Sequence, residues 1–154
     1  MEPTVHCARP GDECEGSFAD RIIVCKLCFR IDSPRRGQIV AFDAPARAKA
    51  DCGEGGTYLK RLIGLPGDVL REDRHGRIWV DGRRLAEPYV TAVARAADTR
   101  FRGGAWVVPD GSYFMLGDNR GDSCDSRTWG AVPRGSLIGP VVATYWPPTR
   151  IGTR

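Results

Sequence analysis

Turn-forming residues recur along this chain at intervals that leave room only for short secondary-structure elements. Glycine and proline supply many of these signals, since the sequence contains 19 glycines and 11 prolines. Between them lie short runs rich in Val, Ile, Tyr and Trp, and no segment has a long apolar period of 3.6 residues. This pattern is typical of short strands joined by tight turns. The sequence therefore predicts an all-β fold.

Residues 78–85 form the clearest expected hairpin, because Asp81-Gly82 separates two short apolar or basic runs and Asp-Gly favours a type I′ turn. By contrast, the alanine-rich residues 92–97 fit either a helical turn or a mobile loop. No internal repeat or low-complexity tract divides the chain. Since 154 residues suit one domain with a sizeable core, we expect a single domain over residues 1–154.

The charge argues against a nucleic-acid-binding protein, and the hydropathy argues against a membrane-spanning segment within this sequence. The net charge of +4 is spread among Arg and Asp without a basic face, which is too mild to indicate a nucleic-acid partner. No apolar run approaches the roughly 20 residues that span a bilayer, and the chain does not open with a signal-peptide pattern. The positive charge fits weak attraction to an anionic membrane surface and fits ordinary solubility equally well.

The six cysteines indicate an oxidising compartment in a chain of this size. Cys7 and Cys14 flank a turn at residues 10–12, so we expect a disulfide between them. Cys25 and Cys28 have the spacing of half a zinc site or of a redox motif. They lie in a strand-like run, however, where residues three apart point to opposite faces, and no second C-x-x-C completes a tetrahedral ligand set. We therefore expect two buried thiols there.

Two blocks of sequence carry polar side chains that strands and turns do not require. The first, residues 58–68, holds Lys60 inside an apolar, strand-like run. Such a lysine either extends its ammonium group to solvent or is held with a lowered pKa for chemistry. The second block, residues 117–130, follows the apolar run Tyr113–Leu116 and concentrates acids, arginines and serines between glycines.

Together these blocks resemble the type I signal peptidases, membrane-bound serine proteases that remove signal peptides. That family carries an S-M-x-P-T box, a K-R-x-x-G-x-P-G-D box and a G-D-N-R-x-x-S-x-D-S-R box. The second (the lysine box) is complete at residues 60–68, and the third (the GDNR box) is complete at 117–127. Residues 36–42 are similar to the family's R-G-D-I-V-V-F strand, and the resemblance continues at residues 132–133 and 138–139. It implies antiparallel coiled sheets of short strands with a catalytic cleft.

The first box begins at its second residue, because the chain opens Met1-Glu2-Pro3-Thr4. In the family the nucleophilic serine immediately precedes that methionine. The resemblance therefore implies that the chain as written lacks the nucleophile, part of the oxyanion hole and the N-terminal membrane helix, and we expect it to be inactive. Truncation, a start assigned too late and true loss of activity all fit this opening.

By resemblance, the catalytic pair is that serine as nucleophile and Lys60 as general base. Apolar neighbours in the same strand would lower the pKa of Lys60 by disfavouring its charged form. In the family the serine of the GDNR box, here Ser123, lies beside the lysine and orients it. Neither His6 nor His75 has an obvious acidic partner, so a Ser-His-Asp triad is poorly supported.

The resemblance also assigns supporting roles in the site. Asp125 is expected to pair with Arg127 and Arg61, holding the two boxes together. Independently of the resemblance, Asp118 and Asn119 are expected to bond backbone amides of their turn, as Asp and Asn commonly do. The aspartates of the GDNR box also suggest a metal site, but the arginines between them already neutralise their charge. We therefore expect neither a metal nor another cofactor.

The implied substrates are secretory preproteins with small residues before the cleavage site. By their positions in the boxes, Met1, Tyr58 and Leu59 are expected to line small apolar subsites, with the peptide added along a strand edge. The resemblance places the protein at the cell membrane with its catalytic domain on the extracytoplasmic side. Attachment would come from an N-terminal helix and from the domain surface.

One covalent link follows from the expected meeting of the boxes. Cys52 lies shortly before the strand that carries Lys60, and Cys124 lies inside the GDNR box. If these boxes meet in space, as the resemblance implies, the two cysteines are placed to form a disulfide.

Three other interpretations remain open. A non-catalytic peptide-binding homologue, or pseudo-peptidase, would keep the boxes but lack the nucleophile, and the codon before Met1 discriminates it. A pilin-processing transfer peptidase of the same superfamily is a second alternative, against which the complete GDNR box argues. A self-cleaving repressor core shares the Ser-Lys chemistry but needs a DNA-binding domain and an internal cleavage site, and neither is visible.

Overall fold

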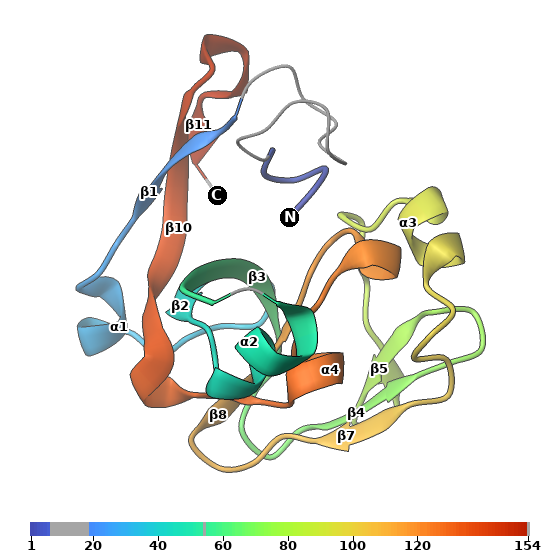
Figure 1. Ribbon diagram of the computed structural model, residues 1–154. Coiled ribbons are helices and arrows are strands. Elements are labelled where there is room, and N and C mark those ends of the chain that lie inside the picture. The colour runs from blue at the N-terminus through green and yellow to red at the C-terminus, as the bar shows by residue number, and fades with distance from the viewer. Residues whose placement is uncertain (7–18, 54, 154) are drawn as a thin grey trace.

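The computed structural model describes residues 1–6, 19–53 and 55–153 and consists mainly of antiparallel strands (Figure 1). Within these ranges, seven strands form one sheet in the order β1-β10-β2-β3-β8-β9, with β11 paired to β10. Four more form a second sheet in the order β6-β5-β4-β7. This arrangement confirms the predicted all-β class. The strands are β1 (Arg21–Val24), β2 (Ile39–Asp43), β3 (Thr57–Gly64), β4 (Val69–Glu72), β5 (Ile78–Val80), β6 (Arg83–Arg84), β7 (Ala105–Val107), β8 (Ser112–Leu116), β9 (Val132–Pro133), β10 (Leu137–Trp146) and β11 (Gly152–Thr153).

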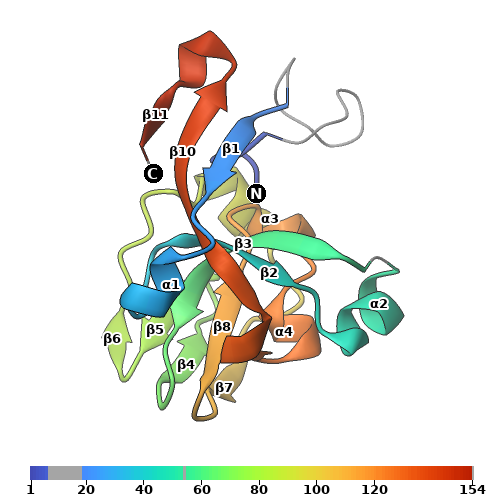
Figure 2. The same cartoon turned by 90° about the vertical axis from the view of Figure 1, so that its left-hand side faces the viewer.

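Strand β10 pairs with different strands along its two halves. Its first half pairs with β2, and its second half pairs with β1 and β11. The second half extends away from the rest of the fold together with its partners (Figures 1 and 2). We call residues 21–24 and 141–153 the β1–β10 arm.

Short helices connect the strands. Helix α2 packs against α4, and α3 packs against η1. None of the helices in the described ranges is both long and apolar enough to cross a membrane. The α-helices are α1 (Cys28–Ile31), α2 (Ala46–Cys52), α3 (Ala92–Ala97) and α4 (Ser126–Trp129), and the 3-10 helices are η1 (Arg120–Asp122), η2 (Arg134–Ser136) and η3 (Pro148–Arg150).

The centre of the first sheet is apolar on both faces, which explains the nearly continuous hydrophobic runs of β2 and β8. Because side chains alternate along a strand, neighbouring residues of β3 enter different clusters. Leu62 packs in a core cluster with Met115, whereas Ile63 packs with Phe114 in a second cluster that also takes side chains from β4 and β5. Strand β3 is therefore held rigidly on both sides.

The expected hairpin at residues 78–85 is present as β5–β6. Val80 and Arg83 are paired, and the two residues between them, Asp81 and Gly82, have φ angles of 48° and 76°. Positive φ at both central positions is the requirement of a type I′ turn, so the Asp-Gly prediction is confirmed.

Two disulfides occur within the described residues. Cys52, at the end of α2, is joined to Cys124, with 6.2 Å between their Cα atoms. Cys25 and Cys28 are joined to each other, so the expectation of two buried thiols is wrong. The chain leaves β1 at Val24 and turns into α1, and the alternation of a strand no longer separates these side chains. The expected Cys7–Cys14 pair lies outside the described residues.

The two described disulfides differ in the length of chain they close, and their contributions to stability should differ accordingly. In the loop-entropy model, a separation of 72 residues stabilises by roughly 4 kcal/mol and a separation of 3 by roughly 2 kcal/mol. Urea unfolding of the oxidised protein should therefore show a larger loss for Cys52→Ala/Cys124→Ala than for the matched control Cys25→Ala/Cys28→Ala. An equal or reversed loss would contradict this expectation.

Candidate active site

Lys60 and Ser123 meet at the centre of the first sheet. The Lys60 ammonium nitrogen donates a hydrogen bond of 2.8 Å to the Ser123 hydroxyl. Strand β3, which carries Lys60, pairs with β8 through Arg61 and Leu116, and the GDNR box follows β8 directly. The chain leaving β8 at Gly117 thus turns back over β3, which is why two boxes far apart in sequence share one site.

Gly117 allows this close approach. A side-chain carbon at this position would overlap the Ser123 hydroxyl and would lie 3.4 Å from the Lys60 nitrogen. No neighbouring flexible group could yield enough to accept it, because Ser123 is itself buried and bonded to Lys60. The first glycine of the GDNR box is therefore a packing requirement of the lysine–serine contact.

Burial lowers the pKa of Lys60 below its ordinary value. The residue keeps some solvent exposure, but its ammonium end is largely enclosed, with its nitrogen 5.8 Å from the centre of the Tyr58 ring. The carboxylate of Asp125 acts in the opposite direction and the Arg127 guanidinium acts with burial. Because burial dominates, Lys60 is closer to being a neutral base at neutral pH than an exposed lysine would be.

The amino end of Met1 lies close enough to Lys60 for the two charges to interact. Burial lowers the pKa of the Met1 amine, and the positive charge of Lys60 lowers it further. The Met1 and Leu59 side chains both pack against the apolar cluster of Val5, Ile39 and Val141. Two of the expected subsite residues therefore border the same cluster.

Tyr58, the third expected subsite residue, occupies a different place. Its ring stacks on Trp129, with 5.3 Å between the ring centres, on the face of β3 that also carries Lys60 and Leu62. Leu59 belongs to the opposite face and a different cluster. The subsite roles of all three residues stay predictions.

Arg61 differs from expectation in its partner. It forms a two-pronged ion pair with Asp118, with N–O distances of 2.9 and 2.7 Å, instead of joining Asp125. Arg61 alternates away from Lys60 along β3, and Asp118 lies two residues beyond its strand partner Leu116. The role expected for Asp118, bonding its own turn, is consequently replaced by this pair and by a hydrogen bond from the Thr4 hydroxyl.

Asp125 pairs with Arg127 as expected. Its carboxylate accepts the side-chain nitrogens Nε and Nη2 of Arg127 at 2.9 Å each and the amide of Gly117 at 3.2 Å. Burial alone would raise the pKa of Asp125, but the Arg127 charge and these hydrogen bonds keep it below its usual range. Asn119, also expected to support the turn, accepts the Asp122 amide through its backbone carbonyl.

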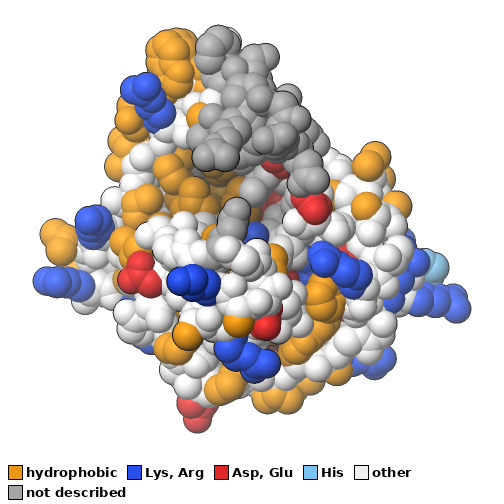
Figure 3. Space-filling view, viewed as in Figure 1, with side chains coloured by type: hydrophobic (Ala, Val, Ile, Leu, Met, Phe, Trp, Pro, Cys, Tyr) orange, Lys and Arg blue, Asp and Glu red, His pale blue; other side chains and the backbone are white. Residues whose placement is uncertain are grey.

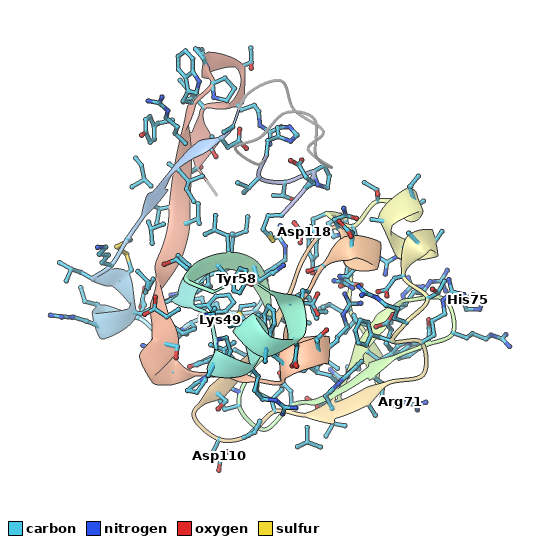
Figure 4. The ribbon with its side chains drawn as sticks, in the orientation of Figure 1. Lys49, Tyr58, Arg71, His75, Asp110 and Asp118 are labelled. Atoms are coloured by element: carbon cyan, nitrogen blue, oxygen red, sulfur yellow. A yellow bond between two sulfur atoms is a disulfide. The ribbon has the colours of Figure 1, made fainter. Side chains whose placement is uncertain are left out.

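Neither histidine reaches this site. The His6 ring pairs with Glu2, so the expectation that it has no acidic partner is wrong for this histidine. His75 lies in an exposed turn, where its backbone amide donates to Asp73. In Figure 4, His75 is far from both Tyr58 and Asp118. Over the described ranges, the His, Cys, Asp and Glu side chains do not gather into a group that could hold a metal ion.

Several polar residues around the site were not singled out from the sequence. Thr4 is partly buried and lies in the first box, and Arg120 is buried and lies in the GDNR box, so their matches to the family boxes were usable signals. The other three are buried acids outside the boxes, which only the folded chain brings together. They are Glu72, Glu87 and Asp98.

Replacing Gly117 with Ala should displace Ser123 and admit water to Lys60, because the new methyl group needs the space of the serine hydroxyl. The pKa of Lys60 should then rise toward about 10.4, the value of an exposed lysine. Competitive acetylation across a pH series, read by peptide mass spectrometry, would measure this. Gly135→Ala is the matched control, since a side chain there meets nothing within 4 Å. An unchanged Lys60 pKa in folded Gly117→Ala would refute the packing argument.

Comparison with known proteins shows the family to which the chain belongs. The family model described as signal peptidase, peptidase S26, matches residues 5–146. A probable signal peptidase I-2 from Synechocystis is 41% identical over 152 residues, covering 99% of this chain and 62% of that protein. A signal peptidase I from Leptolyngbya laminosa is 37% identical over 134 residues, covering 86% and 63%. The chain thus spans under two thirds of the length of these relatives.

A solved structure is also similar. The crystal structure of a signal peptidase I from Enterococcus faecalis superposes with a TM-score of 0.58 at 32% identity, covering 71% of this chain and 97% of that one. Sequence and fold agree that this chain belongs to the signal peptidase family, peptidase S26.

Proposed function

We propose that this chain is the catalytic portion of a serine endopeptidase that removes signal peptides from secretory preproteins through a serine–lysine dyad. The single observation that carries the proposal is the 2.8 Å hydrogen bond from the Lys60 nitrogen to the Ser123 hydroxyl in an enclosed site. Family membership supports the reaction class, and the enclosed lysine supports its mechanism.

The chemistry requires Lys60 to be neutral. A neutral amine has two N–H groups and one lone pair, and donation of one N–H to Ser123 fixes the direction of that lone pair. Lys60 can then accept the proton of a serine hydroxyl as that oxygen attacks the peptide carbonyl. Ser123 acts as a positioning residue, while Asp125 and Arg127 hold the loop on which it lies.

In this proposal the nucleophile is a serine joined to the amino end of Met1. The support is electrostatic proximity, since the Lys60 charge acts on the Met1 amine. A residue joined to the Met1 amine would therefore lie beside the proposed general base, Lys60. Thr4 and Asp118 anchor the segment, because their hydrogen bond ties it to the Arg61 ion pair.

We extend the proposal to the membrane. Exposed apolar side chains gather on the β1–β10 arm, among them Ile23, Tyr145, Trp146 and Ile151 (Figure 3). Such a surface, together with an N-terminal membrane helix, would hold the domain at the lipid where signal peptides reside. The two described disulfides support the extracytoplasmic side, where oxidising conditions preserve them.

The polypeptide as written should release no product from a preprotein, whereas the same chain with serine added before Met1 should cleave it. Lys60→Ala and Lys60→Arg should each abolish that cleavage, because arginine does not deprotonate in proteins. Ser123→Ala should weaken it without unfolding the domain. Gel assays with a preprotein would measure each variant.

The rate should rise with pH through the pKa of Lys60, because only the neutral amine accepts a proton. Since burial lowers that pKa, the acidic limb should lie below that of an exposed lysine. Undiminished turnover in Lys60→Ala would reject the dyad. Binding of signal peptide without cleavage by the serine-extended chain would instead favour a non-catalytic peptide-binding homologue.

A further inference from the structure

Three carboxyl groups surround one guanidinium group beneath the candidate active site. Arg127, on α4, pairs with Asp125, with Asp98 at the end of α3, and with Glu72 at the end of β4, 3.4 Å from the last of these. All four side chains are excluded from solvent. Glu72 and Asp98 lie outside the lysine box and the GDNR box, and the mechanism above does not use them.

The adjoining guanidinium groups do not balance this group. Glu87 lies between Arg120 and Arg95, so four carboxyl groups face three guanidinium groups across the cluster. Lys60 also acts on Asp125, but burial favours its neutral form. A net negative charge in a buried place is costly. Uptake of one proton by one of the carboxyl groups would make the cluster neutral.

Two buried carboxyl oxygens indicate which groups share that proton. Among the described residues, Glu72 Oε1 and Asp98 Oδ1 are buried oxygens without a hydrogen-bond partner. Asp98 contacts Arg127 more closely than Glu72 does, and a 3.4 Å contact is a weak one. Glu72 is therefore the carboxyl group that gains less from being ionised.

The electrostatics agree with this assignment. Burial raises the pKa of Glu72 to about 7, and the Asp98 carboxylate acts in the same direction. Arg127 and Arg120 act against them without cancelling the shift. The charged groups that act on Glu72 are Asp98, which follows α3, Arg127 from α4 and Arg120 from η1. Arg95 of α3 packs beside the same glycine as Glu72, Gly76.

A continuous chain of contacts joins this pair to Lys60. Arg127 holds both oxygens of Asp125, and Asp125 holds the Gly117 amide at 3.2 Å. Gly117 in turn packs against Ser123, which bonds Lys60. The position of Arg127 therefore bears on the alignment of the general base, although neither Glu72 nor Asp98 touches it.

We propose that Glu72 and Asp98 act as a buried one-proton carboxyl pair that positions Arg127, and through Asp125 and Gly117 aligns Ser123 with Lys60. With Asp125 and Glu87 ionised, one carboxylate of the pair suffices to balance the three guanidinium groups of the cluster, and the other carries the proton. The pair is thus a positioning element supplied by the second sheet and α3. Only its consequence for turnover rests on the proposed function.

A double-mutant cycle tests the pair, and it consists of wild type, Glu72→Gln, Asp98→Asn and the double variant. Glutamine has the shape of protonated glutamate, so Glu72→Gln should keep the Lys60 pKa, measured by competitive acetylation. Asp98→Asn should keep it as well, because Glu72 then ionises and takes over the pairing. The double variant leaves the cluster short of one negative charge, should loosen the Arg127–Asp125–Gly117 contacts and so should shift the Lys60 pKa, with a loss of stability larger than the sum of the single losses.

The pH dependence of unfolding supplies a second measurement. The folded pKa of Glu72 is about 7 and its ordinary value is 4.5. The folded state therefore binds the proton more tightly, and that contribution is complete below pH 4.5 and is lost as pH rises through 7. This loss of stability with rising pH should be absent in Glu72→Gln and should occur at lower pH in Asp98→Asn. Asp110→Asn, at an exposed turn far from the site (Figure 4), should behave as wild type.

Clear outcomes would overturn the proposal. One is a Glu72→Gln variant whose Lys60 pKa and stability change as much as those of the double variant. The others are stability losses of the single variants that add up to the loss of the double variant, and a pH dependence of unfolding that neither single variant changes. If the double variant does not fold, the single-variant pH profiles decide. In the serine-extended chain, the double variant should lower kcat with little change in KM. If that chain shows no turnover at all, the proposed function fails, while acetylation and unfolding still decide the proton pair.

Discussion

Pairing of β3 with β8 is the constraint on which the rest of this structure depends. It places the residue that follows Lys60 opposite the last residue before the GDNR box. After Leu116 the chain needs only a short turn back toward β3 to make the other contacts of the site. The lysine–serine hydrogen bond, the Arg61–Asp118 pair and the Asp125–Gly117 bond all form within that return. Apolar packing on both faces of β3 keeps it fixed while these polar groups are buried.

Much of this arrangement was predictable because it is encoded locally. The all-β class follows from turn spacing, and the β5–β6 hairpin follows from one dipeptide whose geometry permits little else. The lysine box and the GDNR box identified Lys60 and Ser123, and the structure brings them together. The link between Cys52 and Cys124 has the same origin, since Cys52 precedes the strand that carries the lysine box and Cys124 lies inside the GDNR box.

The remainder depended on information that a strand pattern does not contain. Cys25 and Cys28 were misjudged because both were placed in a strand-like run, whereas β1 ends at Val24 and Cys28 begins α1. Arg61 was assigned the wrong aspartate because the choice between Asp118 and Asp125 depends on how the chain turns after Gly117. Glu72 and Asp98 look like surface acids in sequence, and only the packing of α3 and β4 around Arg127 buries them.

The Cys52–Cys124 bond also encloses a large part of the fold. The whole second sheet and α3 lie between these two cysteines in sequence. A peptide bond cut anywhere in that stretch, for instance at the exposed β5–β6 turn, leaves two fragments that stay covalently joined. Lys60 and Ser123 would then be carried by different fragments and still remain tethered. The second sheet and α3 can thus be cut once by a protease without release of either the lysine box or the GDNR box.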